Sequence, residues 1–233
     1  MDNKSSFETY LYISQKKLNI SVIQINNLYK VYEKELIIEN NLEKLDFNKL
    51  QIFLDRNILK LEKFLKHFIK SVFIILDTKD FLPINLYIKN NNSGNVLNLE
   101  DLSYSLNQAK YQCKKTSEQK KIIHTIIQNY QIDGKNYSSL PKNLKCNNFS
   151  LDIKFICLSN DIIKDLENSL EQYQISINQI ISLDYIRSFF DNIENLPMKA
   201  RQITKGCNPN EVKFNNKSSK NVGFFEKFFN FFN

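Results

Sequence analysis

The stretch KIIHTIIQNYQID at residues 121–133 and the stretch LDIKFICL at residues 151–158 decide the fold of this chain. The first is apolar on nearly both faces at its start and then alternates apolar with polar residues, which is typical of a β-strand. The second puts alternate apolar residues on one face, namely Leu151, Ile153, Phe155 and Cys157. These patterns predict two strands, each with a buried face.

A helix and two more strands are predicted on the N-terminal side of this pair. The helix begins near Asn98, with Asp101 three residues later as its capping-box partner. Its apolar stripe consists of Leu102, Leu106, Ala109 and Cys113. SVFIILD (71–77) and INLYIKN (84–90) are rich in β-branched and large apolar residues, so we expect a strand in each.

Residues 1–70 predict a strand meander followed by a long helix. Residues 8–38 are rich in Tyr, Ile and Val with partial alternation, and Asp46 suits the N-cap of the helix. Apolar residues then recur at spacings of three and four, which gives one stripe: Phe47, Leu50, Leu54, Ile58, Leu61, Leu65 and Phe68. We interpret this stripe as the core-facing side of the helix and not as a surface for a partner.

Beyond Ser159 the pattern predicts a third helix, a last strand and a short helix. The third helix has an apolar side made of Ile163, Leu166, Leu170 and Tyr173. QIISLDYI (179–186) suggests the strand and IRSFFDNI (186–193) the short helix. The fold class is therefore expected to be α+β, a mixed sheet with helices on one side and an appended small sheet–helix unit.

Composition limits the classes of protein. With 233 residues, 42% of them apolar, the chain suits one globular domain or two small ones with a real core. The four cysteines form no CxxC pair and the two histidines cannot complete a zinc cluster with them, so we expect reduced thiols and no metal. No signal-peptide pattern occurs, and no stretch reaches the about 20 apolar residues that span a bilayer. We expect a cytoplasmic protein.

The basic charge is concentrated near the C-terminus. From Pro197 to Asn221 the apolar periodicity stops, and Pro, Gly, Asn, Ser and Lys dominate, which predicts a flexible linker. Between Pro197 and Lys220 six basic residues are opposed only by Glu211, so most of the net charge of +7 lies there. Because the body itself is nearly neutral, a broad nucleic-acid-binding face is not expected.

The last ten residues contain six of the eighteen phenylalanines. On a helix they form one aromatic face, so residues 221–233 predict a short amphipathic helix suited to the headgroup region of a membrane. The residues expected to bind an anionic membrane surface are Phe224, Phe225, Phe228, Phe229, Phe231, Phe232, Lys213, Lys217, Lys220 and Lys227. Two other interpretations stay open: a terminal helix docked on its own core, and a helix inserted into a partner's groove.

Several segments between residues 101 and 188 follow one another as they do in a known family. They are LNQAKYQCKK, KIIHTIIQNYQIDG, LDIKFICLS, NDIIKDLENSLEQYQIS and INQIISLDYIRS. Together they resemble FtsA, the actin-like family that ties the bacterial division ring to the inner membrane. The residues in register with its strand motif are Ile123, His124, Gln128, Tyr130, Ile132 and Asp133, whereas Ile127 replaces the family's proline and SSLPKNLKCNN its Gly-rich loop.

The resemblance implies a lobe of actin-like (ribonuclease-H-like) type at residues 1–70 and 160–196. It implies an inserted strand–helix–strand–strand subdomain at 71–159, a basic linker at 197–220 and a membrane helix at 221–233. The expected function is a membrane-tethered scaffold on the inner face of the cell membrane that binds cell-division proteins or itself. His124 is then a structural strand residue. The family's FtsZ-docking surface lies in a second lobe that has no counterpart here, so direct FtsZ binding is not implied.

The sequence lacks the turns that hold phosphate in actin-like ATPases. Such enzymes have an Asp-x-Gly turn after the first strand, whereas this hairpin reads YISQKKLNIS, and DNIENLPMKARQ replaces the second such turn. We therefore expect no ATPase activity and no cofactor. Two alternatives stay open: a degenerate ATPase or other hydrolase that uses Asp77, Asp80 or Asp133, and a nucleic-acid-binding module that uses the basic aromatic tail.

Overall fold

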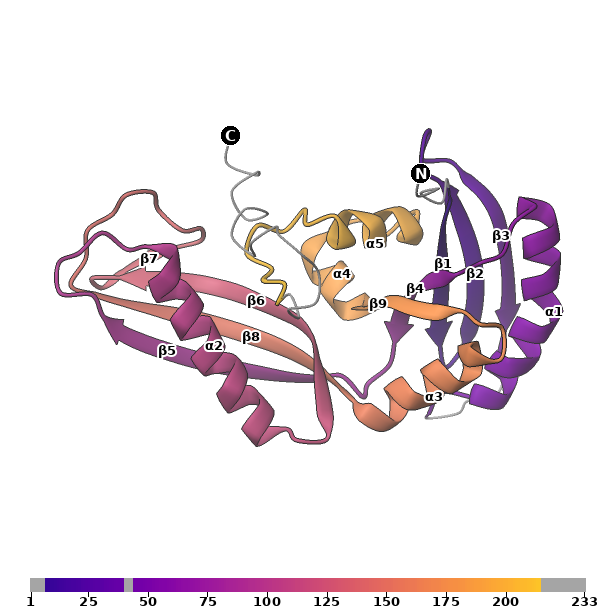
Figure 1. Cartoon of the computed structure of the whole chain (residues 1–233), viewed down its shortest axis with the longest axis horizontal. Helices are drawn as coiled ribbons and strands as arrows, with labels where there is room; N and C mark the ends of the chain where they lie inside the picture. The colour runs from indigo at the N-terminus through magenta and orange to yellow at the C-terminus, as the bar shows by residue number, and fades with distance from the viewer. Residues whose placement is uncertain (1–6, 40–43, 215–233) are drawn as a thin grey trace. The chain divides into compact units, whose positions relative to one another are not determined.

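The computed structural model describes residues 7–39 and 44–214, which form two compact units (Figure 1). Unit 1 comprises residues 7–81 and 160–205, and unit 2 comprises residues 82–159 and 206–214. Residues 82–159 of unit 2 are therefore inserted in the sequence of unit 1. The C-terminal segment, from residue 206 on, belongs to unit 2 as well. The helix predicted at residues 221–233 lies outside the described residues.

Unit 1 contains a five-stranded mixed sheet with the order β3-β2-β1-β4-β9. β1 (Phe7–Ser14), β2 (Lys17–Gln24) and β3 (Lys30–Ile37) form the predicted antiparallel meander. β4 (Ser71–Asp77) pairs in parallel with β1, and β9 (Ser176–Ser182) pairs in parallel with β4. An antiparallel meander continued by parallel strands is the sheet of a ribonuclease-H-like lobe.

Helices cover both faces of this sheet. α1 (Phe47–Leu65) and α3 (Asn160–Glu171) pack together on one face, while α4 (Leu183–Phe189) and α5 (Leu196–Thr204) lie on the other (Figure 1). The expectation of helices on one side was wrong, because α4 and α5 cover the second face, and α5 was not predicted. Its nine residues bury few side chains, so they give too short an apolar stripe to stand out from the polar sequence around them.

The linker predicted at residues 197–220 is also wrong over its described part. Pro197 occupies the first turn of α5, where proline is favoured because its missing N–H costs no helical hydrogen bond. Ala200 and Ile203 are fully buried. The chain then continues into unit 2, where it pairs with a strand instead of remaining free.

The strand at residues 71–77 belongs to unit 1 and not to the inserted subdomain, where the sequence analysis placed it. β4 lies between β1 and β9, and its five central residues are buried. A continuous apolar run suits a central strand with both faces covered, but it does not tell which sheet contains the strand. The insertion therefore begins at Leu82.

Two element ends differ from the prediction, whereas the start of α1 agrees with it. Asp46 caps α1 by accepting the N–H of Lys49 at 2.9 Å. Phe68 lies beyond the end of α1 and is 78% exposed, so it is not part of the buried stripe. Residues 183–186 begin α4 instead of continuing the last strand, because the Ser182 side chain accepts the N–H of Tyr185 and caps the helix.

The first two strands have one apolar and one polar face. Leu11 and Ile13 of β1 and Leu18, Ile20 and Val22 of β2 are buried on the apolar face. The polar face lies under α4 and α5 and comprises Glu8, Tyr10, Tyr12, Lys17, Asn19 and Ser21. Because successive side chains of a strand point to opposite sides, a regular alternation in the sequence separates these two sets.

An ion pair on the polar face holds α5 against β1. Arg201 Nε donates to Glu8 Oε2 at 2.9 Å, and Lys205 Nζ lies 3.4 Å from Glu8 Oε1. The Tyr10 hydroxyl also donates to Glu8 at 2.9 Å. The side chains of Glu8 and Arg201 are 10% and 19% exposed, whereas that of Lys205 is 57% exposed. Arg201 is therefore the cation that compensates the burial of this carboxylate.

Unit 2 contains a four-stranded antiparallel sheet with the order β5-β8-β6-β7. Its strands are β5 (Leu82–Asn91), β6 (Lys120–Ile132), β7 (Lys135–Tyr137) and β8 (Asn148–Ser159). α2 (Leu99–Thr116) covers one face, as Figure 1 shows. The two strands from which the fold was first inferred, β6 and β8, are paired at the centre of this sheet.

The core of unit 2 agrees with the sequence patterns. The capping box of Asn98 and Asp101 is present at the start of α2. The predicted stripe of α2 packs on the predicted face of β8, and both sets are buried: Leu102, Leu106, Ala109, Cys113, Leu151, Ile153, Phe155 and Cys157. Unit 2 therefore has an apolar core of its own.

The Arg201→Ala variant should lower the free energy of unfolding by about 2 kcal/mol, because it leaves the Glu8 carboxylate largely buried without its main cation. Lys205→Ala is the matched control, since it removes an exposed cation from the same carboxylate and should cost under about 0.5 kcal/mol. Urea denaturation checks both values, and equal losses in the two variants would show that Arg201 has no special role.

Candidate interaction sites

The turn between β1 and β2 is closed by a serine side chain. Ser14 Oγ accepts the N–H of Lys16 at 3.3 Å and the N–H of Lys17 at 2.9 Å, and it donates to the carbonyl of Lys17 at 3.0 Å. A phosphate-binding turn needs backbone N–H groups that point outward and are unoccupied. Here two N–H groups of the turn are already used inside the hairpin.

The three candidate carboxylates belong to different units, and each has hydrogen-bond partners in its own unit. Asp77 accepts the Tyr12 hydroxyl at 3.0 Å, and Asp80 accepts the Thr78 hydroxyl at 2.6 Å. Burial, and then the neighbouring Asp77, raise the pKa of Tyr12, although its hydrogen bond to Ser14 acts the other way. Asp77 and Asp80 belong to unit 1, whereas Asp133 belongs to unit 2.

Asp133 shapes the hairpin between β6 and β7. Its φ of 44° and that of Gly134 at 81° give the two left-handed residues of a tight hairpin turn. Its carboxylate accepts the N–H of Asn147 at 3.0 Å and the N–H of Asn148 at 2.8 Å. These contacts give Asp133 a structural role.

Residues 208–212, which we name the C-terminal strap, pair with the edge of β6. Ile127 N–H donates to the Asn210 carbonyl at 2.9 Å, and Val212 N–H donates to the Thr125 carbonyl at 2.8 Å. β7 pairs with the same strand further along, at residues 130–132. The strap therefore continues the sheet along an edge whose backbone groups would otherwise lack strand partners.

A buried His–Glu pair fixes the strap. His124 Nδ1 lies 2.7 Å from Glu211 Oε1, and the two side chains are 0% and 3% exposed. The sequence analysis gave His124 a structural role and counted Glu211 as a charge in a flexible linker. The second assignment was wrong because a residue distant in sequence pairs with it, and sequence spacing gives no signal of such a pair.

Apolar contacts continue the strap into the core of unit 2. Val212 is 4% exposed and belongs to the core cluster, and Phe214 packs against the same cluster. Lys110 of α2 lies over the Phe214 ring, 4.0 Å from its centroid. The end of the described chain is therefore held on unit 2 by backbone hydrogen bonds, by the His124–Glu211 pair and by aromatic contacts.

Of the predicted membrane-binding residues, Lys213 alone lies within the described chain. It is exposed and follows Val212 at the end of the strap. The six phenylalanines and Lys217, Lys220 and Lys227 lie outside the described residues. Their expected role in membrane binding thus stays a prediction from the sequence.

Two tyrosines are exposed on the outer side of α2. Tyr104 and Tyr111 are each 69% exposed, and their spacing of seven residues puts them on one side of the helix. Tyrosine is enriched at protein–protein interfaces because it combines a large apolar ring with a hydroxyl. These side chains form a candidate surface for a protein partner.

Cys113 and Cys157 of unit 2 have the properties of core residues. The sulfur atoms of Cys113 and Cys157 are 3.7 Å apart, and both side chains are fully buried. Burial raises the pKa of Cys157 to about 12 and also raises that of Cys113. These thiols stay protonated at neutral pH, which makes them poor nucleophiles.

Within residues 7–39 and 44–214, no group of three or more His, Cys, Asp or Glu side chains is placed to hold a metal ion. Over the same residues, no helix is both long and apolar enough to cross a lipid bilayer.

Comparison with known proteins gives a likeness in structure only. No protein-family model matches the chain, and no curated protein matches it. The PilM–PilN type IV pilus biogenesis complex is similar with a TM-score of 0.50 and 6% identity over 85% of this chain and 52% of that one. At this identity the likeness shows the fold and nothing further.

Two other solved structures are more distant. One is the cytoplasmic domain of EpsL, an inner-membrane component of the type II secretion system of Vibrio cholerae, with a TM-score of 0.40 and 10% identity over 78% of this chain and 58% of that one. The other is a Bacteroides thetaiotaomicron protein with an actin-like ATPase fold and unknown function, with a TM-score of 0.32 and 17% identity over 81% and 58%. The chain thus spans between half and three fifths of the length of these structures.

The fold class expected from the sequence is confirmed. The chain has a mixed α+β lobe with the strand order of the actin-like type and an inserted antiparallel unit with its own helix. The likeness in structure to the PilM–PilN complex extends over 85% of this chain. The comparisons do not single out FtsA.

The Glu211→Ala variant should lower the free energy of unfolding of unit 2 by about 3 kcal/mol, because it breaks a buried pair and loosens the strap. Hydrogen exchange should report faster exchange at the amides of Ile127 and Val212, which form the pairing with β6.

Glu118→Ala, at an exposed acidic residue of the same unit, is the matched control and should leave these amides protected. The double variant His124→Leu with Glu211→Leu should recover part of the loss, since apolar groups replace both partners. Unchanged protection of Ile127 in Glu211→Ala would contradict the role of the pair.

Proposed function

We propose that this chain is a non-catalytic, membrane-tethered scaffold with a role like that of FtsA in bacterial cell division. The observation that carries the proposal is the course of the C-terminal segment. After unit 1 the chain pairs with β6 through the strap, and the basic and Phe-rich sequence follows directly. Unit 2 would thereby connect a membrane-binding sequence to a surface for partner proteins.

The arrangement of the hairpin turn supports a role without catalysis. Ser14 occupies N–H groups of the turn where an actin-like ATPase would hold phosphate, and the candidate carboxylates have structural contacts. The buried thiols of Cys113 and Cys157 have raised pKa values. A rise in melting temperature at millimolar ATP would contradict this part of the proposal.

The membrane-binding strength expected from the tail is modest. Each lysine near an anionic leaflet contributes about 1 kcal/mol, and a short aromatic helix adds apolar burial in the headgroup region. One such tail binds reversibly. Several tails on an assembly would bind far more firmly, because each further contact becomes intramolecular. This is the behaviour expected of a scaffold that associates with itself or with division proteins.

A second candidate function is an adaptor of a different envelope machine. The likeness of this chain to the PilM–PilN type IV pilus biogenesis complex favours it, because that fold serves there in an assembly with another protein. The two candidates share a scaffold role and differ in their partners.

Deletion of residues 221–233 should release the protein from anionic liposomes, because it removes all six clustered phenylalanines and one lysine. Co-sedimentation with phosphatidylglycerol-containing vesicles measures the bound fraction. A triple variant with Ser at Phe224, Phe228 and Phe232 should behave like the deletion.

The matched control changes Asn221, Val222 and Asn230 to Ser, which leaves every phenylalanine in place, and should sediment like the wild type. Sedimentation that persists after the deletion would rule out the tail as the membrane anchor. Binding to single-stranded DNA without binding to vesicles would support the nucleic-acid alternative instead.

A pull-down from the native cell identifies the partners and tests the α2 surface. Tyr104→Ser combined with Tyr111→Ser should reduce capture of a partner by about tenfold or more, because exposed tyrosines contribute strongly when an interface covers them. Tyr29→Ser, at a tyrosine of unit 1 that is 70% exposed, is the control.

Capture of cell-division proteins would support the first candidate function, and capture of pilus or secretion components would support the second. An equal reduction by the double α2 variant and by Tyr29→Ser would show that α2 is not the partner surface.

A further inference from the structure

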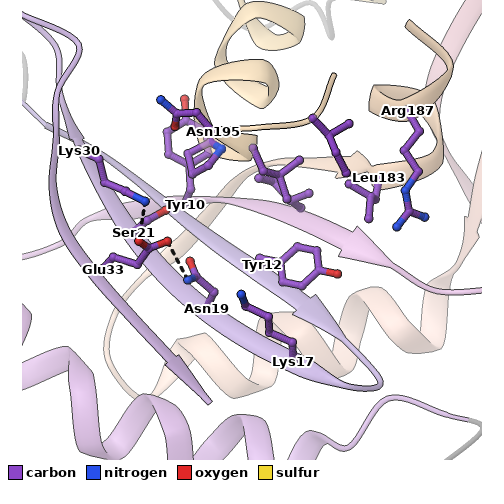
Figure 2. Close-up of a pocket in the computed structure, with 14 residues that line it drawn as sticks. Tyr10, Tyr12, Lys17, Asn19, Ser21, Lys30, Glu33, Leu183, Arg187 and Asn195 are labelled. Carbon is purple, nitrogen blue, oxygen red and sulfur yellow. Dashed lines mark hydrogen bonds and ion pairs between the residues drawn. The ribbon is translucent and has the colours of Figure 1, made fainter. Parts of the chain in front are cut away.

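The polar face of unit 1 forms the floor of a pocket of about 330 Å³ (Figure 2). The roof comes from α4, from the start of α5 and from the residues that connect them, and it is mostly apolar: Leu183, Ile193, Leu196 and Pro197. Its size lies at the lower end of the range for small-molecule sites. All residues that line it belong to unit 1.

The floor consists of cross-strand rows of polar and aromatic residues. Tyr10 lies opposite Ser21, which lies opposite Glu33 on the next strand. Tyr12 lies opposite Asn19 in the neighbouring row. Polar side chains on a covered sheet face are costly unless each has a partner, so this floor differs from an ordinary core.

Most of these polar groups have partners. Asn19 donates to Glu33 at 3.0 Å, and Lys30 also binds Glu33. Ser21 is 1% exposed, and its hydroxyl is the one buried side-chain polar atom without a hydrogen-bond partner among the described residues. An unsatisfied hydroxyl beside an open cavity is the arrangement expected where a ligand supplies the missing hydrogen bond.

The charges that line the pocket are mainly positive. Lys17, Lys30 and Arg187 are opposed by Glu33, which already binds Lys30 and Asn19. Figure 2 shows the Tyr12 ring lying between the labelled Lys17 and Arg187 side chains. The lining therefore includes two cations on either side of an aromatic ring.

Two of the three carboxylates that pair with these cations are exposed, and the third, Asp77, is 31% exposed. Lys17 pairs with Glu35, whose side chain is 51% exposed, and Arg187 pairs with Asp184, whose side chain is 73% exposed. Asp77 lies further from Arg187, at 3.6 Å. Because exposed ion pairs contribute little to stability, an acidic group of a ligand can replace these carboxylates at low cost.

We propose that this pocket binds a small organic anion that carries a flat apolar body. Lys17 and Arg187 attract the acidic group, and the body lies beside the Tyr12 ring under Leu183 and Ile193. A polar atom of the natural ligand pairs with the hydroxyl of Ser21. The site is distinct from the membrane-binding tail and from the α2 surface, so it adds a ligand to the proposed scaffold.

Two fluorescent probes that differ in one acidic group test this inference on the full chain. 8-Anilinonaphthalene-1-sulfonate has a flat apolar body and a sulfonate, and N-phenyl-1-naphthylamine has a similar body without the charge. Titration of the protein with each probe, followed by fluorescence, should show one site that binds the sulfonate probe more tightly than the neutral probe. Lys17→Gln and Arg187→Gln should each weaken binding of the sulfonate probe by about threefold to tenfold and leave the neutral probe unchanged.

Lys89→Gln, at an exposed lysine of β5 in unit 2, is the matched control and should not change the affinity. Ile193→Trp places a large ring at the pocket, where Ile193 is 39% exposed, and should abolish this binding without unfolding the chain. Circular dichroism and melting temperature verify that each variant is folded.

Three results would overturn the inference. Equal weakening by Lys89→Gln would indicate general attraction to a basic surface. Full binding in Ile193→Trp would place the probe elsewhere, and equal affinity for both probes would exclude an anion as the ligand. None of these results bears on liposome binding. The test of the pocket is therefore independent of the test of the scaffold role.

Discussion

The alternation of apolar and polar side chains in β1 and β2 is the constraint on which unit 1 depends. Because neighbouring residues of a strand point to opposite faces, a shift of one residue in register would exchange the whole apolar set with the polar set. The apolar face carries α1 and α3, and the central strand β4 is covered on both sides. The polar face then requires a different cover, with charged and hydroxyl-bearing partners.

The partners of buried polar groups explain the segments that are least regular in sequence. Arg201 brings α5 to the sheet because Glu8 is buried there, and Glu211 brings the strap to β6 because it pairs with His124. In each case the segment is short and has little apolar surface. One contact of a buried glutamate, together with a few apolar contacts, fixes its position against the sheet. An unpaired buried charge costs several kcal/mol, so the folded state strongly favours the one position of the segment in which the charge has its partner.

Sequence periodicity was sufficient for the parts of the fold that have long apolar faces. The meander, α1 with its Asp46 cap and α2 with its Asn98 capping box are as predicted, because each has three or more turns or strands of regular pattern. The run at residues 71–77 was recognised as a strand but assigned to the wrong unit, since a strand that is apolar on both faces gives no information about its neighbours.

The candidate sites were less predictable, for a related reason. The pocket brings together residues of four strands and two helices, and Ser21 and Arg187 carry no signal that would link them in sequence. The alternation Glu8, Tyr10, Tyr12 was visible, but a half-polar strand usually faces solvent, so its burial under α4 and α5 could not be inferred. The pairing of His124 with Glu211 spans 87 residues and has no local pattern.

The structure also changes how the basic C-terminal stretch should be understood. Arg201 and Lys205 bind Glu8 within unit 1, and Glu211 is buried against His124, so these charges do not act on a membrane. The lysines left for that role are Lys213 at the end of the strap and those that follow it in sequence. At about 1 kcal/mol each they cannot hold a single chain firmly. If the proposed tether holds, it depends on the phenylalanines and on assembly, so we expect binding to the membrane to strengthen with the number of chains in the assembly.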